Sequence, residues 1–408
     1  MLNKFSTKKT KNDFFIVKTC CWYFTEFVLL IKTTVHTYTP TYNHKQYAKS
    51  LKFSEKQHVL CQPRLHSVFC PLMQQFLVIQ TAFTGDVVLA TAILEKLHQN
   101  FPNARIDFLL RKGNEGLLQQ HPFITKLLIW DKQTQKNKNL LKIALEVRKE
   151  RYTHVINLHR FATSGLITFL SGAEFKAGFD KNPFSFCYTR KVHHIISEPY
   201  SGEPVHEVAR NQMLISDITG GDFEFPKLYP SPVDYDLVKQ YQGAPYICIA
   251  PSSVWFTKQF PAEKWVALID ALPDSYPVYL LGAPSDSDLA ESILAKIRRG
   301  YVKNLCGKLG FLQSAALMQG AEMNYANDSA PLHFATAMNA PVTGVFCSTV
   351  PAFGFGPLRA NGKVVEIKER LYCRPCGLHG HKACPEGHFR CALEITNDQL
   401  LWWTSRAT

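Results

Sequence analysis

The chain has 408 residues, of which 46% are hydrophobic and 19% are charged. This composition is that of a globular protein and excludes a largely disordered chain, and the length predicts two or three domains. The net charge of +13 invites a nucleic-acid or membrane-surface function, but residues 1–75 hold 11 Lys/Arg and 3 Asp/Glu and supply +8 of it. The balance of +5 suits an ordinary soluble protein or an enzyme that meets anionic sugars or phosphates.

Residues 1–75 differ from the rest of the chain, and three interpretations of them compete. The apolar stretch 14–31 resembles a signal anchor, although Lys18 and Glu26 interrupt it. The second interpretation is a disordered or loosely packed extension. The favoured interpretation is that translation begins at Met73, just before the first predicted strand, and that the upstream segment is a start-site artefact or a dispensable tail.

The stretch 76–97 predicts the first strand, loop and helix of an α/β fold. Residues 76–79 are apolar without interruption, as in a strand buried on both faces, and apolar residues recur at helical spacing from Val87 to Leu97. Similar units follow, which indicates a parallel sheet with helices on both faces. In this half we expect strands at 106–110, 124–129 and 154–158, a helix at 139–150, weaker elements at 166–170, 177–179 and 193–196, and a closing helix at 206–218.

Gly220-Gly221 and the proline-rich stretch 226–232 interrupt the pattern and mark a boundary. The sequence therefore predicts an N-terminal domain over 76–225 and a C-terminal domain over 226–408, both doubly wound, with a ligand cleft between them. In the second half we expect strands at 246–250, 278–282, 302–305, 321–325 and 342–346, and helices at 263–272, 287–298, 312–320, 332–338 and 397–403.

Polar residues at predicted strand ends are the candidate site residues. Asp86 follows Gly85 at the carboxyl end of the first strand, where α/β proteins bind ligands. Two interpretations of Asp86 stay open, namely the N-cap of the next helix and a functional carboxylate at the mouth of the cleft. Three stations follow strands of the second half: Ser252 and Ser253 with Lys258, then Asp286, then Asp328, Ser329 and Ala330 with His333.

Each of these three stations also has an ordinary explanation, such as a surface lysine, a helix-start carboxylate or a packed histidine. Loop amides, a helix N-terminus and Lys258 nevertheless suit a diphosphate, and Asp286 suits the hydroxyls of a ribose. Their recurrence at successive strand ends of one domain favours a nucleotide site.

Five segments in this order resemble the lipopolysaccharide heptosyltransferase family, glycosyltransferase family 9: FLVIQTAFTGDVVLATAILEKL, APSSVWFTKQFPAEKW, LLGAPSDSDLAE, NLCGKLGFLQSAALMQGA and NDSAPLHFATAMNAPV. The resemblance runs from Phe76 to the C-terminus. It implies the two-domain GT-B fold and inverting transfer of heptose from ADP-heptose to the lipopolysaccharide inner core or a related surface glycan, with no cofactor required for catalysis.

The resemblance also implies roles for individual residues. Asp86 matches the general base that takes the proton of the acceptor hydroxyl. Lys258 matches the lysine on the donor phosphates, Ser252 and Ser253 the loop beside them, and Asp286 the ribose contact. The second diphosphate station is matched by Asp328, Ser329, Ala330 and His333. The implied acceptor is a lipid-linked anionic glycan, and the implied location is cytoplasmic, peripheral to the inner face of the inner membrane.

Three residues depart from the family pattern. Ala330 stands where glycine is common, which limits how closely the backbone approaches a phosphate. Gln80 replaces a basic residue at the end of the first strand, and Phe83 stands where small residues are common. Because these two lie on the acceptor side, the acceptor and the transferred sugar stay open.

The chain has 12 cysteines, four of them before residue 76 and four scattered through the rest. Scattered single cysteines predict reduced, buried thiols in a cytosolic protein. The last four, Cys373, Cys376, Cys384 and Cys391, cluster within the segment 373–391. A structural zinc site, a redox-variable disulfide pair and free thiols stay open for them, and four thiolates on one zinc would leave no position for catalysis.

Functions other than heptosyl transfer also fit parts of this sequence. Within the same fold, the chain could use another nucleotide-activated sugar or bind a sugar nucleotide without turnover. A different class is a nucleic-acid-binding protein whose cysteine cluster is a zinc module. The concentration of basic charge in residues 1–75 and the lack of interleaved aromatic and basic residues argue against nucleic acid as a partner.

Overall fold

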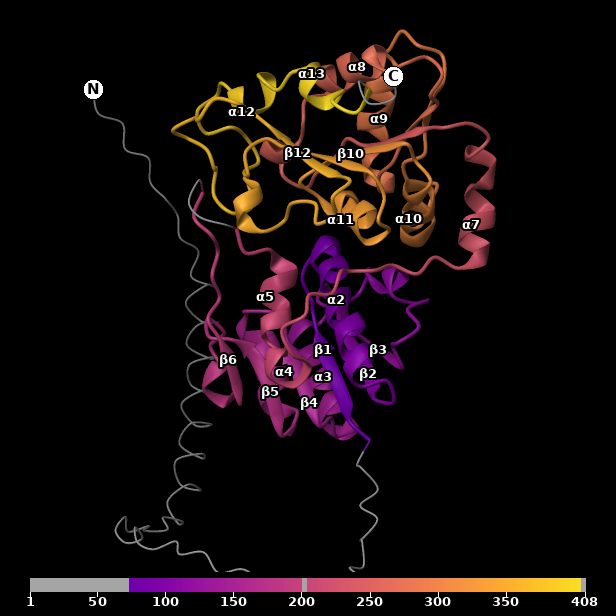
Figure 1. Cartoon of the computed structure of the whole chain (residues 1–408). Coiled ribbons are helices and arrows are strands. Elements are labelled where there is room, and N and C mark those ends of the chain that lie inside the picture. The colour runs from indigo at the N-terminus through magenta and orange to yellow at the C-terminus, as the bar shows by residue number, and fades with distance from the viewer. Residues whose placement is uncertain (1–72, 200–203, 405–408) are drawn as a thin grey trace, which may run out of the picture. The chain divides into compact units, whose positions relative to one another are not determined.

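The computed structural model describes residues 73–199 and 204–404, which all belong to one compact unit, Phe69–Thr408. Two six-stranded parallel sheets with helices form this unit, which confirms the predicted α/β class (Figure 1). The predicted extension 1–75 lies outside the described residues apart from its last three. The predictions made for the stretch 14–31 therefore concern residues that the structure does not describe. Among the described helices, none has the length and apolar character that crossing a bilayer requires.

The first sheet has the strand order β3-β2-β1-β4-β5-β6. β1 is an inner strand and pairs in parallel with β2 and β4. Its side chains alternate between two cores, because Phe76 and Val78 join one cluster whereas Leu77 and Ile79 join another. The strands are β1 Gln75–Ile79, β2 Arg105–Arg111, β3 Lys126–Trp130, β4 His154–Asn157, β5 Phe175–Phe179 and β6 Arg190–Val192.

Helices cover both faces of the first sheet. α2 (Thr84–Asn100) packs on the face of Phe76 and Val78, and α3 (Lys136–Glu150) and α4 (Ala162–Leu170) share the core of the opposite face. The chain then passes through α5 (Glu207–Met213), α6 (Ser216–Thr219) and α7 (Pro232–Val238). The predicted domain boundary at residue 225 falls within this connection.

The second sheet has the order β12-β11-β10-β7-β8-β9, and its helices also cover two faces. Its strands are β7 Ile247–Ala250, β8 Val278–Leu280, β9 Val302–Asn304, β10 Met323–Asn327, β11 Val342–Phe346 and β12 Gly362–Glu366. Its helices are α8 Ala262–Ala271, α9 Ser287–Leu294, α10 Phe311–Gln319, α11 Ala330–Ala337, α12 Arg390–Leu393 and α13 Asn397–Leu400. Short 3-10 turns include η1 Glu115–Leu117, η2 Ser185–Cys187, η3 Lys239–Tyr241, η4 Phe256–Lys258, η5 Pro284–Asp286 and η6 Pro351–Phe353.

Several predicted elements need correction. The last strand of the first sheet is Arg190–Val192 and not 193–196, and the predicted helix 206–218 is broken into α5 and α6. The proline-rich stretch 226–232 leads directly into α7, because Pro232 occupies the first turn of that helix, where no amide donor is needed, and Ser231 caps it. β12 has no counterpart among the predicted strands, since only the interior residue Val365 of its polar sequence is buried.

The two halves share a hydrophobic core. Residues of α2, including Val87 and Val88, belong to the same buried cluster as Leu332 and Ala335 of α11. α2 and α11 are in direct contact. The loops at the carboxyl ends of β1 and β10 are consequently brought together at one junction.

Candidate active site

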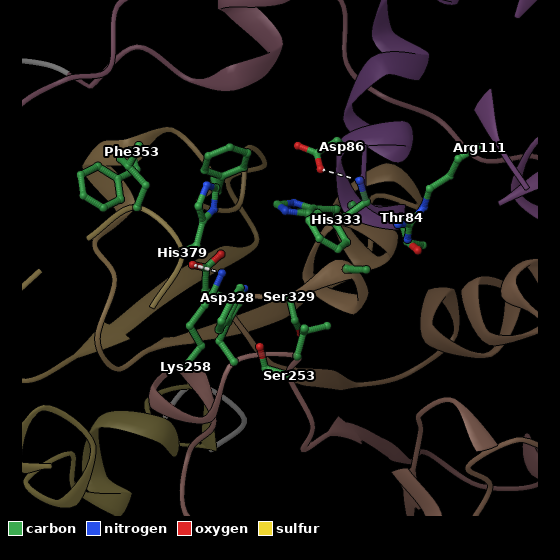
Figure 2. A pocket seen from close by; sticks show the side chains of 17 residues that line it. Thr84, Asp86, Arg111, Ser253, Lys258, Asp328, Ser329, His333, Phe353 and His379 are labelled. Carbon is green, nitrogen blue, oxygen red and sulfur yellow. Dashed lines mark hydrogen bonds and ion pairs between the residues drawn. The ribbon is translucent and has the colours of Figure 1, made fainter. Parts of the chain in front are cut away.

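A cavity of about 260 Å³ lies at this junction and is lined by both halves of the chain (Figure 2). The first half contributes the loop and first turn 83–86 together with Arg111. The second half contributes three segments that follow strands β7, β10 and β11, and a fourth from the cysteine-rich segment. Of the sequence-predicted residues, seven line this cavity: Asp86, Ser253, Lys258, Asp328, Ser329, Ala330 and His333.

Asp86 lies in the first turn of α2, three residues after the N-cap Phe83. Its Oδ2 accepts a hydrogen bond from the Phe83 backbone N–H at 3.1 Å. The other oxygen points away from that bond (Figure 2). Asp86 is therefore not the N-cap, as one interpretation of the sequence had it, but the N3 residue of a capping box, and its side chain also lines the cavity. Burial, and then the nearby Glu207 carboxylate, raise the pKa of Asp86 to about 6.

Gly85 permits the close approach of the two halves. A Cβ atom at this position would lie 2.8 Å from Cδ2 of His333 and 3.6 Å from Cα of Ala330. Any larger residue would therefore push α2 away from α11. Gly85 lies inside α2 and has no positive φ, so it is needed here for the packing between the halves and not for the turn that the sequence predicted.

Lys258 is held by a carboxylate. Its Nζ lies 2.7 Å from Oδ2 of Asp328, and both side chains are largely buried. The same oxygen accepts a hydrogen bond from the Thr349 hydroxyl at 2.6 Å. Asp328 therefore orients the lysine at the cavity wall, a function that the sequence analysis did not assign to it.

His333 lies one turn into α11 and is 4% exposed. Its Nδ1 has no hydrogen-bond partner among residues 73–199 and 204–404. Burial is the main factor that lowers its pKa to about 4, so the imidazole is neutral at pH 7. A neutral, unpartnered ring nitrogen beside Asp86 and Lys258 suits a hydrogen bond to a bound ligand.

Ser252 and Asp286 do not line the cavity. The Ser252 hydroxyl donates to Oδ1 of Asp286 at 2.8 Å, and Oδ2 accepts from the Ala283 backbone N–H at 2.8 Å. Both oxygens of Asp286 thus stabilise the loop around η5. The ribose contact of Asp286 stays a prediction.

Two lining residues come from the cysteine-rich segment 373–391, for which the sequence predicted no ligand contact. Leu378 and His379 enter the cavity because the loop that carries them is bonded to η4. The His381 N–H donates to the Thr257 hydroxyl at 2.7 Å, and Thr257 N–H donates back to the His381 carbonyl at 3.1 Å.

The four clustered cysteines are free thiols. Cys391 is buried in the core of the second sheet, and the Cys376 thiol donates to the Cys373 carbonyl at 3.3 Å. No group of three or more His, Cys, Asp or Glu residues within the described chain is arranged to hold a metal ion. Burial, and then the neighbouring thiols of Cys376, Cys384 and Cys373, raise the pKa of Cys391. The zinc site predicted at these four cysteines stays a prediction.

Helix α5 anchors the loop that carries the cavity residues Phe353 and Phe355. His206 Nε2, the Glu207 backbone N–H and Arg210 Nη2 donate to backbone carbonyls of residues 353–356 at 3.0, 2.9 and 2.7 Å. Arg210 also forms an ion pair with Glu207 at 2.7 Å. The first half thus positions a wall of the cavity that belongs to the second half.

On the acceptor side, a lysine lies close to Gln80, the residue that replaces a basic residue of the family pattern at the end of β1. Lys132 follows β3, and its Nζ donates to the carbonyl and the hydroxyl of Thr81 at 2.8 and 2.9 Å. Burial, and then repulsion by Arg111, lower the pKa of Lys132 to about 8. A cation is therefore present beside the end of β1, although it comes from another strand.

Comparison with known proteins agrees with this arrangement. The sequence model of glycosyltransferase family 9 (heptosyltransferase) matches residues 140–386, more than half of the chain. Lipopolysaccharide heptosyltransferase 3 of Escherichia coli is 28% identical over 280 residues, which cover 65% of this chain and 82% of that protein. Lipopolysaccharide heptosyltransferase 1 of Pseudomonas aeruginosa is 23% identical over 347 residues, covering 80% and 93%.

The structure of the E. coli ADP-heptose lipopolysaccharide heptosyltransferase II has a TM-score of 0.66 to this chain. The two are 19% identical, and the match covers 82% of this chain and 98% of that one. These findings confirm the predicted family resemblance and the predicted GT-B fold.

Proposed function

This chain belongs to glycosyltransferase family 9 and is a glycosyltransferase, and we propose that it moves heptose from ADP-heptose to the lipopolysaccharide inner core or a related surface glycan, with inversion. The observation that carries the proposal is the single cavity in which Asp86 of one half meets Lys258, Ser329 and His333 of the other. A carboxylate base and a cationic nucleotide side are the two parts that such a transfer requires.

Asp86 is the proposed general base. Its pKa of about 6 leaves it ionised at pH 7 and yet basic enough to take a proton from a hydroxyl as that group attacks. The acceptor oxygen forms a bond to the anomeric carbon while the bond from that carbon to the phosphate oxygen breaks. The proton goes to Asp86 and the electron pair leaves with ADP, so one displacement inverts the anomeric centre.

Lys258 is the proposed partner of the departing diphosphate. Its charge and the amides at the start of α11 would offset the negative charge that develops on ADP, so the proposed reaction requires no metal. Asp328 keeps Lys258 in place through the 2.7 Å contact. Ser253, Ser329, Ala330 and His333 supply the remaining donor contacts, and Ser252 and Asp286 stay candidates for the ribose side.

The proposed acceptor is a lipid-linked anionic glycan, reached at the inner face of the inner membrane from the cytoplasm. Arg111, which lines the cavity, and Lys132 provide cations on that side. An alternative within the family is another nucleotide-activated sugar, which the departures at Gln80 and Phe83 favour. The nucleic-acid alternative combined a zinc module at the four cysteines with a basic tail, and the concentration of basic charge in residues 1–75 argues against it.

Calorimetric titration of the full chain with ADP-heptose, and with ADP, GDP and UDP as controls, tests the donor. We expect micromolar binding that is selective for the adenine nucleotides. Preference for another base, or no binding, would contradict the heptosyl proposal and leave the fold assignment intact.

A further inference from the structure

Helix α3, helix α4 and the η2 turn form one outer surface of the first half, which we call the α3–α4 face. α3 and α4 pack side by side on the same core, and Arg148 of α3 donates to the Leu170 carbonyl at 3.1 Å (Figure 1). The η2 turn packs on α4, because a Cβ at Gly165 would lie 2.9 Å from Cβ of Phe184. The three elements therefore present a continuous surface.

Large apolar side chains protrude from this face. Leu141 and Leu145 of α3 are 58% and 59% exposed, Phe161 at the start of α4 is 62% exposed, and Phe186 of η2 is 70% exposed. The Phe186 ring lies against Phe169 of α4, with centroids 6.1 Å apart. Exposed apolar groups that gather in this way mark an interaction surface.

The same face is cationic. Lys138, Lys142 and Lys149 are exposed and lie at helical spacing with the two leucines, on one side of α3. None of the three forms an ion pair with any described residue. The carboxylates of α3 do not offset them, because Glu146 and Glu150 are both bound by Lys126, at 2.9 and 2.8 Å.

We propose that the α3–α4 face docks on an anionic phospholipid bilayer. Leucine and phenylalanine side chains enter the boundary between headgroups and acyl chains, while lysine ammonium groups on flexible stems reach the lipid phosphates. A second copy of the chain is a poorer occupant, because a symmetric interface would bring the same lysines together.

The position of the face links it to the reaction. α3 begins shortly after the carboxyl end of β3, and Phe161 follows the carboxyl end of β4. The loop that carries Asp86 starts from the same edge, because carboxyl ends of parallel strands lie together. Docking here therefore brings the active site to the headgroup level, an inference that rests on the proposed lipid-linked acceptor.

The test is flotation of the full chain with vesicles of equimolar phosphatidylcholine and phosphatidylglycerol, and with vesicles of phosphatidylcholine alone. We expect binding to the anionic vesicles that weakens as salt is added. The double variant Leu141→Ser/Leu145→Ser should lower the partition coefficient at least about tenfold. The matched control is Val233→Ser/Leu237→Ser, an exposed apolar pair with the same spacing on α7, which should leave partitioning unchanged.

Lys138→Gln/Lys142→Gln is the second variant, and it alters only exposed charges that need not affect folding. We expect about fivefold weaker partitioning per lysine on anionic vesicles and no change on neutral ones. Equal binding of the leucine variant and the parent would overturn the proposal, as would binding that ignores lipid charge. Loss of RNA binding or of a dimer in these variants, with vesicle binding retained, would also overturn it.

Titration with ADP-heptose separates this inference from the proposed function. The three double variants should bind the donor like the parent, because none of the altered residues lines the cavity. Failure of the parent to bind ADP-heptose would contradict the proposed function. The vesicle experiment would still test whether the α3–α4 face binds anionic lipid. If the parent binds the donor but the variants partition onto vesicles like the parent, only the proposed docking of the α3–α4 face is contradicted.

Discussion

The carboxyl edges of the two sheets are built alike, yet they offer opposite chemistry to the cavity. At the first edge Asp86 has no cationic partner within ion-pair distance among the described residues, and its pKa is raised to about 6. At the second edge Lys258 is bound to Asp328 at 2.7 Å. An unpaired, partly buried carboxylate is ready to accept a proton, whereas a lysine that is held by a carboxylate is a positioned charge. Both groups follow a strand of an α/β unit, so their position does not explain their different proposed roles. The difference is that the proposed base has no ion-pair partner among the described residues, whereas the lysine on the proposed donor side has one.

Replacing Asp86 should have the largest effect. We expect Asp86→Ala to lower kcat by at least about a hundredfold, because the proton of the attacking hydroxyl loses its acceptor. The dissociation constant of ADP-heptose should change little. Steady-state kinetics and calorimetry check this, and Asp236→Ala, at an exposed aspartate, is the control. A variant as active as the parent would remove Asp86 from the mechanism.

Replacing Lys258 should instead affect binding. Lys258→Ala should weaken ADP-heptose binding about tenfold or more, since a charged hydrogen bond of about 1.5–3 kcal/mol is lost. Asp328→Asn should weaken it less, because the lysine remains and only its orientation is relaxed. Calorimetry on both variants ranks them, with Lys296→Ala, an exposed lysine distant in sequence, as the control. An unchanged dissociation constant for Lys258→Ala would contradict its phosphate contact.

The pH dependence tests the difference between the two edges without a substitution. Because Asp86 must be ionised to act, kcat/KM should rise with pH, level off above the pKa of about 6, and fall about tenfold per pH unit below it. The residual activity of Asp86→Asn should lack this limb. A limb near pH 4 in the parent would show that the carboxylate is not perturbed as its burial implies.

The contact between the edges is tested at Gly85. Gly85→Ala should lower the free energy of unfolding by about 1 kcal/mol, because the added methyl meets the His333 ring at 2.8 Å. Gly221→Ala is the matched control, since nothing lies near a Cβ there. In the double variant Gly85→Ala/His333→Ala the two effects should not add. Additive effects in thermal or denaturant unfolding would contradict a direct contact.

Much of the structure at the first edge could be predicted from the sequence. The run 76–79 and the helical spacing after Gly85 predict strand, loop and helix, and the structure places β1 and α2 there. Asp86, Lys258 and His333 are predicted at strand ends, and a parallel sheet brings its strand ends to one edge whatever the details of packing. The meeting of Lys258 and His333 follows from that rule, whereas Asp86 joins them through the contact of α2 with α11.

Other residues that line the cavity could not be predicted from the sequence. Phe353, Phe355 and His379 reach the cavity because α5 and η4 hold their loops by hydrogen bonds that join segments far apart in the sequence. The cysteine spacing left a zinc site, a disulfide pair and free thiols open, because whether four thiols converge depends on loop packing, which spacing along the chain does not determine. Lys132 lies beside the end of β1 only because β2 and β1 follow β3 in the sheet order.

The hydrophobic periodicity and the polar residues at predicted strand ends were therefore sufficient for the α/β class and the main candidate residues, and the resemblance of five segments indicated the family, because all of these are local properties of the sequence. The pairing of Lys258 with Asp328, the raised pKa of Asp86 and the docking of α5 on residues 353–356 were decided only by the tertiary structure. Each of them depends on distances between segments far apart in the sequence, and burial and neighbouring charges, which set pKa values and pairing, exist only once those segments have packed.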